Sequence, residues 1–287
     1  MAVHDQRYRA YTGPRTAPSR RLLILPRYAF RSVFRSRIFT GFYAVGFAIP
    51  VGAAIWIYLH YNLEALGVMR LQASQLMAID AVFFAGLMSY QAFFLGFLVT
   101  LLAGPGLVSA DLANNALPLY LSRPFSRTQY VLGKASVLVI LLSAITWVPG
   151  TILFFFQGSL AGAGWLGENA RIGLAIVAGC GIWIVVASLL ALALSAYVRR
   201  KLLAQAALLG IVFGGTLLAK TVNLVFATRW GDLLSLPEVL TSVWSGLYGI
   251  ESQNGIPGAA AWATLLALSI ALTALLYRKL TAYEVQR

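Results

Sequence analysis

Six long apolar stretches constrain this chain more than any other feature of its sequence. A helix needs roughly 20 predominantly apolar residues to cross the hydrocarbon core of a bilayer. Each stretch provides enough residues for one crossing, so the sequence predicts an all-α, polytopic membrane protein with six transmembrane helices. The prolines at 50 and 149 fall inside spans, where we expect kinks. The predicted spans are 38–60, 81–103, 135–157, 172–197, 202–226 and 259–277.

The composition excludes an ordinary soluble domain. Of the 287 residues, 60% are hydrophobic and 11% are charged, whereas soluble domains carry about 25% charged residues. The net charge of +13 would suggest nucleic acid in a soluble protein. Here the basic residues form short clusters between apolar runs, and we expect no nucleic-acid partner. Cys180 is the single cysteine, and His4 and His60 lie far apart, so the sequence predicts no metal site.

Basic residues are distributed unequally between alternate loops. With the N-terminus in the cytoplasm, the inner segments hold 18 of the 22 Lys and Arg residues but only three of the nine acids. Because cytoplasmic loops carry an excess of Lys and Arg, we predict a multi-pass protein of the cytoplasmic membrane with both termini inside. The expected organisation is a basic N-terminus over 1–37 followed by one six-span membrane domain over 38–287.

The segment before the first span has an amphipathic pattern. Arg27, Arg31 and Arg35 are four residues apart and share one helical face, while Phe30 and Phe34 occupy another. Such a helix can lie along the inner leaflet, with its arginines toward lipid phosphates. The same arginines are also explained by topology alone, or by contact with a cytoplasmic partner.

The loop between the fifth and sixth spans, 229–258, has a second amphipathic pattern. Leucine, valine and tryptophan recur there at helical spacing, and we predict a helix lying on, or dipping into, the outer leaflet. An irregular loop is the alternative. The residues of the pattern are Leu236, Leu240, Val243, Trp244 and Leu247.

Motifs for nucleotide binding and hydrolysis are missing from the sequence. There is no G-x-x-x-x-G-K-S/T phosphate loop, no G-x-S-x-G and no H-E-x-x-H. Among polar residues at membrane depth, Ser89, Gln91 and Lys220 are candidates for a transport pathway. Interhelical hydrogen bonding is an equal explanation for Ser89 and Gln91, and Lys220 can extend its amine toward the outer interface.

A polar segment, DLANNALPLYLSRPFSRTQYVLGK, connects the second and third spans at 111–134. It follows Gly-Pro-Gly at 104–106, which allows a sharp turn, and Asp111 can cap what comes next. Pro118 and Pro124 prevent a long helix. The segment therefore predicts a short, rigid, cationic elbow suited to docking on another protein, although a generic amphipathic loop has the same composition.

This elbow resembles the first cytoplasmic loop of ABC-2 type transporter permeases. The resemblance is carried by Asp111, by LPLYLSRPFSR at 117–127, by Tyr130, and by Gly-Lys at 133–134. The six-span layout, the basic N-terminal helix and the long outer loop extend it along the chain. A departure is DLANNA at 111–116, where the family commonly has a Glu and a basic or Gly-Thr element.

The resemblance implies the membrane subunit of an ABC exporter that works by alternating access. Its expected partners are two copies of a cytoplasmic ABC ATPase, a second permease of the same or a similar kind, and membrane lipid. ATP and Mg would be bound by the ATPase, so this chain itself is expected to be neither an enzyme nor a cofactor-binding protein. The elbow would be the coupling helix, with ATPase contacts at Asp111, Leu117, Leu121, Ser122, Arg123, Pro124, Arg127, Tyr130 and Lys134.

A second reading belongs to a different class: a six-span protein that works without an ATPase, as an assembly factor, a channel or a membrane enzyme. An enzyme would more often show buried acids, histidines or a metal cluster, and a channel would show a polar ring along one span. The sequence shows neither pattern, and nothing in the spans selects a substrate.

Overall fold

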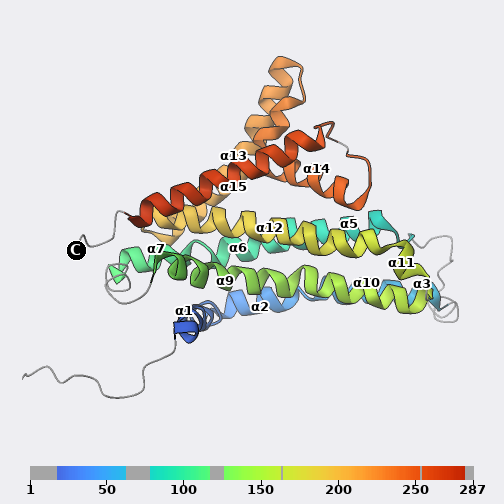
Figure 1. The fold of residues 1–287 in the computed structure, drawn as a ribbon, viewed down its shortest axis with the longest axis horizontal. Coiled ribbons are helices and arrows are strands. Elements are labelled where there is room, and N and C mark those ends of the chain that lie inside the picture. Colours follow the sequence, from blue (N-terminus) through green and yellow to red (C-terminus); the bar gives the residue numbers. More distant parts are fainter. Residues whose placement is uncertain (1–17, 63–77, 117–125, 163, 253, 282–287) are drawn as a thin grey trace, which may run out of the picture.

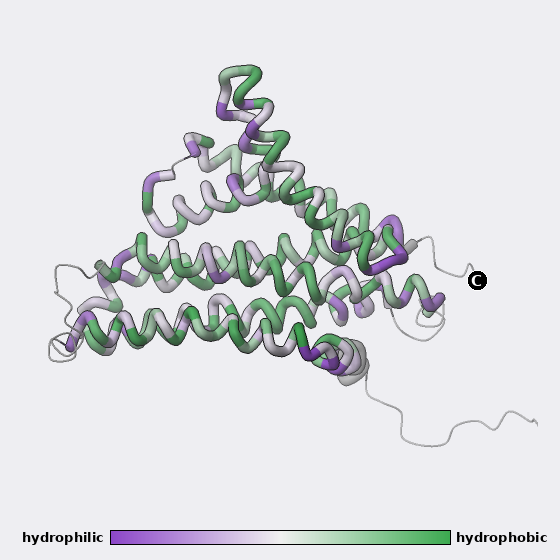
Figure 2. The backbone as a smooth tube through the Cα atoms, turned by 180° about the vertical axis from the view of Figure 1, so that it is seen from behind, coloured by the Kyte–Doolittle hydropathy of each residue, from purple (hydrophilic) through white to green (hydrophobic). Residues whose placement is uncertain are grey.

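The computed structural model describes residues 18–62, 78–116, 126–162, 164–252 and 254–281. The described residues are helical, without strands, and the helices run largely side by side (Figure 1). Six continuous helical runs are long and apolar enough to cross a membrane, which confirms the predicted six spans of a multi-pass membrane protein. They are Arg37–Tyr61, Ala81–Ala113, Arg127–Ala161, Ala170–Tyr197, Lys201–Phe226 and Gly258–Lys279. Figure 2 shows long hydrophobic stretches on these helices, with the most hydrophilic residues mainly near their ends.

The first and third spans are each broken one turn before a proline. The first consists of α2 (Arg37–Val45) and α3 (Ala48–Tyr61), and the third consists of α9 (Arg127–Ile145) and α10 (Trp147–Ala161). Pro50 and Pro149 have no N–H for the carbonyl four residues earlier, which in a regular helix would accept that hydrogen bond. Both helices are thus interrupted at the positions where kinks were expected.

The second span is the least regular. It begins as α5 (Ala81–Ser89), widens into a π-helix, η2 (Tyr90–Gly96), and continues as α6 (Phe97–Ala103) and α7 (Gly106–Ala113). Gly104 and Pro105 separate α6 from α7 but keep right-handed helical angles. The prediction of a sharp turn at this Gly-Pro-Gly sequence is therefore wrong, because the chain continues in the same general direction. The second helical run is also longer than predicted.

The fourth span, α12 (Ala170–Tyr197), is the centre of the bundle. It packs against α7, α9, α10 and the two C-terminal helices α14 (Leu236–Tyr248) and α15 (Gly258–Thr281). Many of its buried residues are Ala, Ser and Gly, which permit close approach of neighbouring helices. A short helix, α11 (Trp165–Glu168), connects α10 to α12.

The fifth span, α13 (Lys201–Phe226), diverges from the bundle. Its C-terminal half projects away from the other helices together with the 3₁₀-helix η3 (Trp230–Leu234) (Figure 1). Leu224 and Phe226 near its end are 84% and 73% exposed. Most of this helix therefore offers an apolar surface to its surroundings.

A helix, α14, is present between the fifth and sixth spans, as expected, while its location at the outer leaflet stays a prediction. Leu240, Val243 and Trp244 are buried, and Leu236 and Leu247 pack against the core. The Trp244 indole donates a hydrogen bond to the carbonyl of Gly179, which lies in the third turn of α12. The apolar face of α14 is therefore covered by protein.

A helix also precedes the first span, as α1 (Pro18–Val33), and it packs against α9. Arg27 and Arg31 are exposed, while Ala29 on another face is buried. Arg35 lies beyond the end of the helix, so the predicted three-arginine helical stripe contains only two of its members. Location of α1 at a lipid surface stays a prediction.

Candidate functional site

The two ends of the bundle differ in charge. We call one the α7 end (α1, the start of α2, α7, the start of α9, the junction of α12 and α13, and the end of α15) and the other the α11 end (α11 and the first turns of α5 and α12). Among the described acids, only Asp111 belongs to the α7 end; the others are Asp80, Glu168, Asp232, Glu238 and Glu251. Described basic residues at the α7 end are Arg27, Arg31, Arg35, Arg37, Arg127, Lys134, Arg199, Arg200, Lys201, Arg278 and Lys279.

Three residues predicted from the elbow meet at this end. Lys134 Nζ lies 2.8 Å from Asp111 Oδ2, and the side chains are 9% and 13% exposed, respectively. The hydroxyl of buried Tyr130 donates to the same carboxylate oxygen at 2.6 Å. The Lys134 amine also lies 5.7 Å from the centre of the Tyr130 ring. The structure thus joins α7 to α9 through a largely buried, charge-assisted cluster.

Asp111 has a different structural role from the one its sequence position suggested. It lies inside α7 rather than capping a following helix. The third helix begins at Arg127, earlier than the predicted span, and its cap is Ser126. The Ser126 hydroxyl accepts from Gln129 N, and the Gln129 side chain accepts from Ser126 N, which completes a capping box. Tyr130 and Lys134 consequently share a face of α9, four residues apart.

Ser195 is a residue at this end that sequence reasoning missed. Its hydroxyl, on α12, donates to Pro105 O and accepts from the backbone amides of Val108 and Ser109. The Gly-Pro break leaves these first amides of α7 without partners in their own helix. The Gly-Pro-Gly sequence therefore indicated that a polar side chain elsewhere must accept from them. The start of α7 is thereby fixed to the central helix.

Arg127 reaches the last span. Its guanidinium carbon lies 5.7 Å from the centre of the Tyr277 ring on α15. The other predicted elbow contacts, Leu117, Leu121, Ser122, Arg123 and Pro124, lie outside the described residues. The described parts of the elbow are therefore its two ends, residues 111–116 and 126–134.

Gln91 explains how the first span tolerates its proline. The Gln91 side chain is fully buried, and its Nε2 donates to Gly46 O at 3.0 Å. Gly46 lies four residues before Pro50, so its carbonyl is the one that the proline leaves without an intrahelical donor. Gln91 therefore makes the interhelical hydrogen bond that was the alternative to a pathway role.

The other two pathway candidates have surroundings different from those of Gln91. Ser89 is half-buried on the wall of a pocket, and Lys220 is exposed on the diverging part of α13. Within the described residues, no three His, Cys, Asp or Glu side chains gather closely enough to hold a metal ion.

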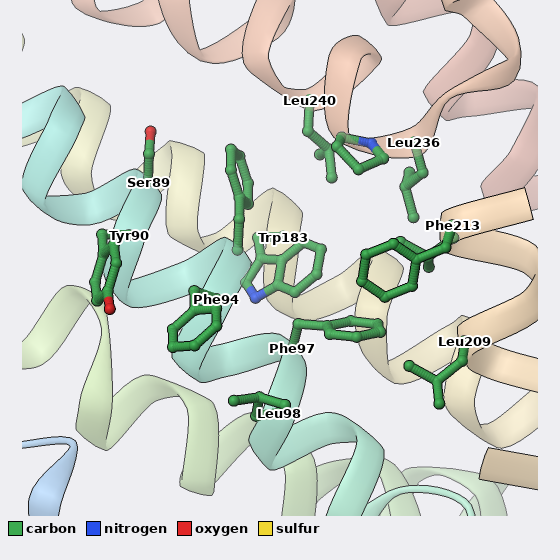
Figure 3. Close-up of a pocket in the computed structure, with 13 residues that line it drawn as sticks. Ser89, Tyr90, Phe94, Phe97, Leu98, Trp183, Leu209, Phe213, Leu236 and Leu240 are labelled. Carbon is green, nitrogen blue, oxygen red and sulfur yellow. The ribbon is translucent and has the colours of Figure 1, made fainter. Parts of the chain in front are cut away.

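The pocket lies between the second span, at its π-helix and the adjoining ends of α5 and α6, and the helices α12, α13 and α14 (Figure 3). Its volume is about 580 Å³, within the range of roughly 300–1,000 Å³ usual for ligand sites. Ser89 and Tyr90 provide its only hydroxyl groups. The other lining residues are apolar or aromatic: Phe93, Phe94, Phe97, Leu98, Trp183, Leu209, Val212, Phe213, Leu236, Pro237 and Leu240.

The chain has no match among known protein-family models. A search of curated proteins likewise found no significant relative.

Proposed function

We propose that this protein is the membrane-spanning permease subunit of an ATP-driven exporter of the ABC-2 type. In this proposal the chain lies in the cytoplasmic membrane with the α7 end and both termini in the cytoplasm. It pairs with a second permease and with two ATPase subunits, which bind ATP and Mg. The segment 111–134 is the part that the ATPase moves.

The observation that carries the proposal is the ion pair between Asp111 and Lys134. It ties the two ends of the elbow together and joins the second helical run to the third. These runs, of 33 and 35 residues, are the two longest of the six. A force applied to the elbow is therefore delivered to both runs at once, as a coupling element requires.

Charge at the α7 end supports the orientation. A surface rich in Lys and Arg is expected on the cytoplasmic side of a membrane, and it complements an acidic groove on a soluble partner. When the ATPase pair closes on ATP, it pushes the elbow, and the motion passes through α7 and α9 so that access to the two sides alternates.

The first test measures ATP hydrolysis by the assembled complex. The tagged chain is purified from its native membrane in mild detergent, and Mg-ATP hydrolysis in the eluate is assayed together with the identity of every co-purified chain. We expect a stoichiometric subunit that contains a phosphate loop. A fully functional protein that purifies without an ATPase would contradict the proposal and favour the ATPase-independent reading.

Charge reversal tests whether the ATPase binds the elbow or the positive charge of the α7 end in general. Arg123→Glu combined with Arg127→Glu should abolish ATPase co-purification while the protein still inserts. The control is Arg199→Glu with Arg200→Glu, which changes the net charge equally at the same end but outside the elbow. Equal loss of the ATPase in both double variants would show that total charge, rather than the elbow, recruits it.

A further inference from the structure

The pocket beside the π-helix is a hollow lined mainly by apolar side chains within the membrane-spanning part of the chain. Ser89 is the ninth residue of the second span, and Leu209 is the ninth of the fifth, so both lie about 12 Å along their helices from where these begin. An apolar cavity does not hold water, and an empty one forfeits the dispersion contacts of its walls. The pocket therefore favours an apolar occupant that the bilayer can supply.

The pocket has a closed side and an open side. Trp183 and Leu240 on its closed side are buried, at 4% and 0% exposed. Tyr90, Phe94 and Phe213 on the open side are 51%, 49% and 63% exposed. The opening thus lies between η2 and α13, which face each other across the pocket (Figure 3). Because both are membrane-spanning elements, a ligand enters sideways, from the hydrocarbon.

One basic side chain, that of Lys220, lies on the same face of α13 as this opening. Lys220 follows Phe213 by seven residues, so both side chains lie on the same face of α13, about 10 Å apart along its axis. Lys220 is exposed and forms no ion pair with any residue that the structure describes. It is also close to the end of the span, where an amine can meet a lipid headgroup.

We propose that the pocket binds one hydrocarbon chain of an anionic membrane lipid, whose headgroup is held by Lys220. The chain contacts the aromatic and leucine side chains of η2, α12, α13 and α14, and the phosphate pairs with the amine. This inference goes beyond the proposed function, which names no ligand. Binding of this kind needs no ATPase, so the two proposals can fail separately.

The test uses the full chain in lipid nanodiscs that contain phosphatidylglycerol with a diazirine on its acyl chain. After illumination, labelled peptides are located by mass spectrometry. We expect labelling at 89–98 and 209–213 to exceed labelling of Ile152 and Phe155, which are exposed on α10. Equal labelling of the pocket and of α10 would mean that the probe reacts only as bulk lipid around the protein, and it would overturn the proposal.

Two variants test the pocket and the cation separately. Leu209→Trp fills the pocket and should reduce labelling at 89–98 at least fivefold, whereas Leu203→Trp, on another face of α13, should leave it unchanged.

Lys220→Gln, an exposed change that leaves folding intact, should reduce labelling by phosphatidylglycerol about fivefold but not labelling by the zwitterionic phosphatidylcholine analogue. Labelling that is insensitive to both Leu209→Trp and Lys220→Gln would overturn the proposal.

Discussion

At the scale of single residues, three buried polar groups that one helix leaves unpaired are satisfied by a residue of another helix. The carbonyl that Pro50 leaves unpaired accepts from Gln91, and the first amides of α7 donate to Ser195. The carboxylate of Asp111 receives both Tyr130 and Lys134. Each pairing is local in space but distant in sequence.

Removing the carboxylate should strongly destabilise the α7 end. Asp111→Asn leaves the Lys134 charge largely buried without a partner, and we expect a loss of about 3–5 kcal/mol. Asp111→Leu combined with Lys134→Met should recover part of it, because the two apolar groups need no partner, although the buried Tyr130 hydroxyl loses its acceptor. Denaturant titration of the purified protein in detergent measures the free energy of unfolding of both variants.

Asp80→Asn is the matched control for the loss of an acid. Asp80 caps α5 through two backbone amides, and Asn caps a helix about as well as Asp, so stability should change little. Equal losses for Asp111→Asn and Asp80→Asn would contradict the importance of the buried pair.

Gln91 and Pro50 should be energetically coupled. Gln91→Leu leaves the Gly46 carbonyl without a donor and should cost about 1–3 kcal/mol. In a Pro50→Ala background the new amide at position 50 can serve that carbonyl, so the cost should be smaller. The comparison control is Gln205→Leu, which removes a bond to Leu101 O and should cost the same in both backgrounds. An unchanged cost of Gln91→Leu would refute the pairing.

At the scale of elements, α14 shows how a helix outside the six spans becomes part of the core. Its Trp244 ring lies against Gly179 of α12, and a Cβ on this glycine would meet ring atoms at 3.1 Å. The absence of a side chain at position 179 therefore sets how closely the two helices approach.

A methyl group at this contact should loosen α14. Gly179→Ala crowds the Trp244 ring, and we expect a destabilisation of about 1–3 kcal/mol with faster hydrogen exchange across 236–248. Gly181→Ala is the control, since a Cβ there meets nothing within 4 Å. Unchanged exchange in the Gly179 variant would mean that the contact does not hold α14 in place.

Periodicity and length predicted the elements well, because both depend on local sequence. The six spans, α14 and the proline breaks follow from apolar runs, helical spacing and the missing proline N–H. The π-helix and the continuation through Gly104 and Pro105 depend on contacts with other helices. The end of α1 before Arg35 is local, because Ser36 caps the start of α2. Of the candidate site, the residue types of the Asp111–Lys134 cluster could be predicted, but their pairing across the elbow required the packed structure.

At the scale of the whole molecule, the concentration of positive charge at the α7 end leads to a prediction about orientation. Glu251→Cys places a thiol on the loop that follows α14, and Arg199→Cys places one at the α7 end; both positions are exposed. The native Cys180 is buried and should not react. In intact cells, a membrane-impermeant maleimide should label position 251 only, and the reverse result would contradict a cytoplasmic α7 end.

The divergence of α13 has a mechanical consequence for the membrane. Because this helix leans out from its neighbours, its tilt determines how much bilayer area the protein displaces. Work against the lateral pressure of the lipids grows with that area, so a compressed bilayer favours an upright α13 and a relaxed one favours the splayed arrangement. In the splayed arrangement, the area that the protein occupies in the membrane is therefore set largely by α13.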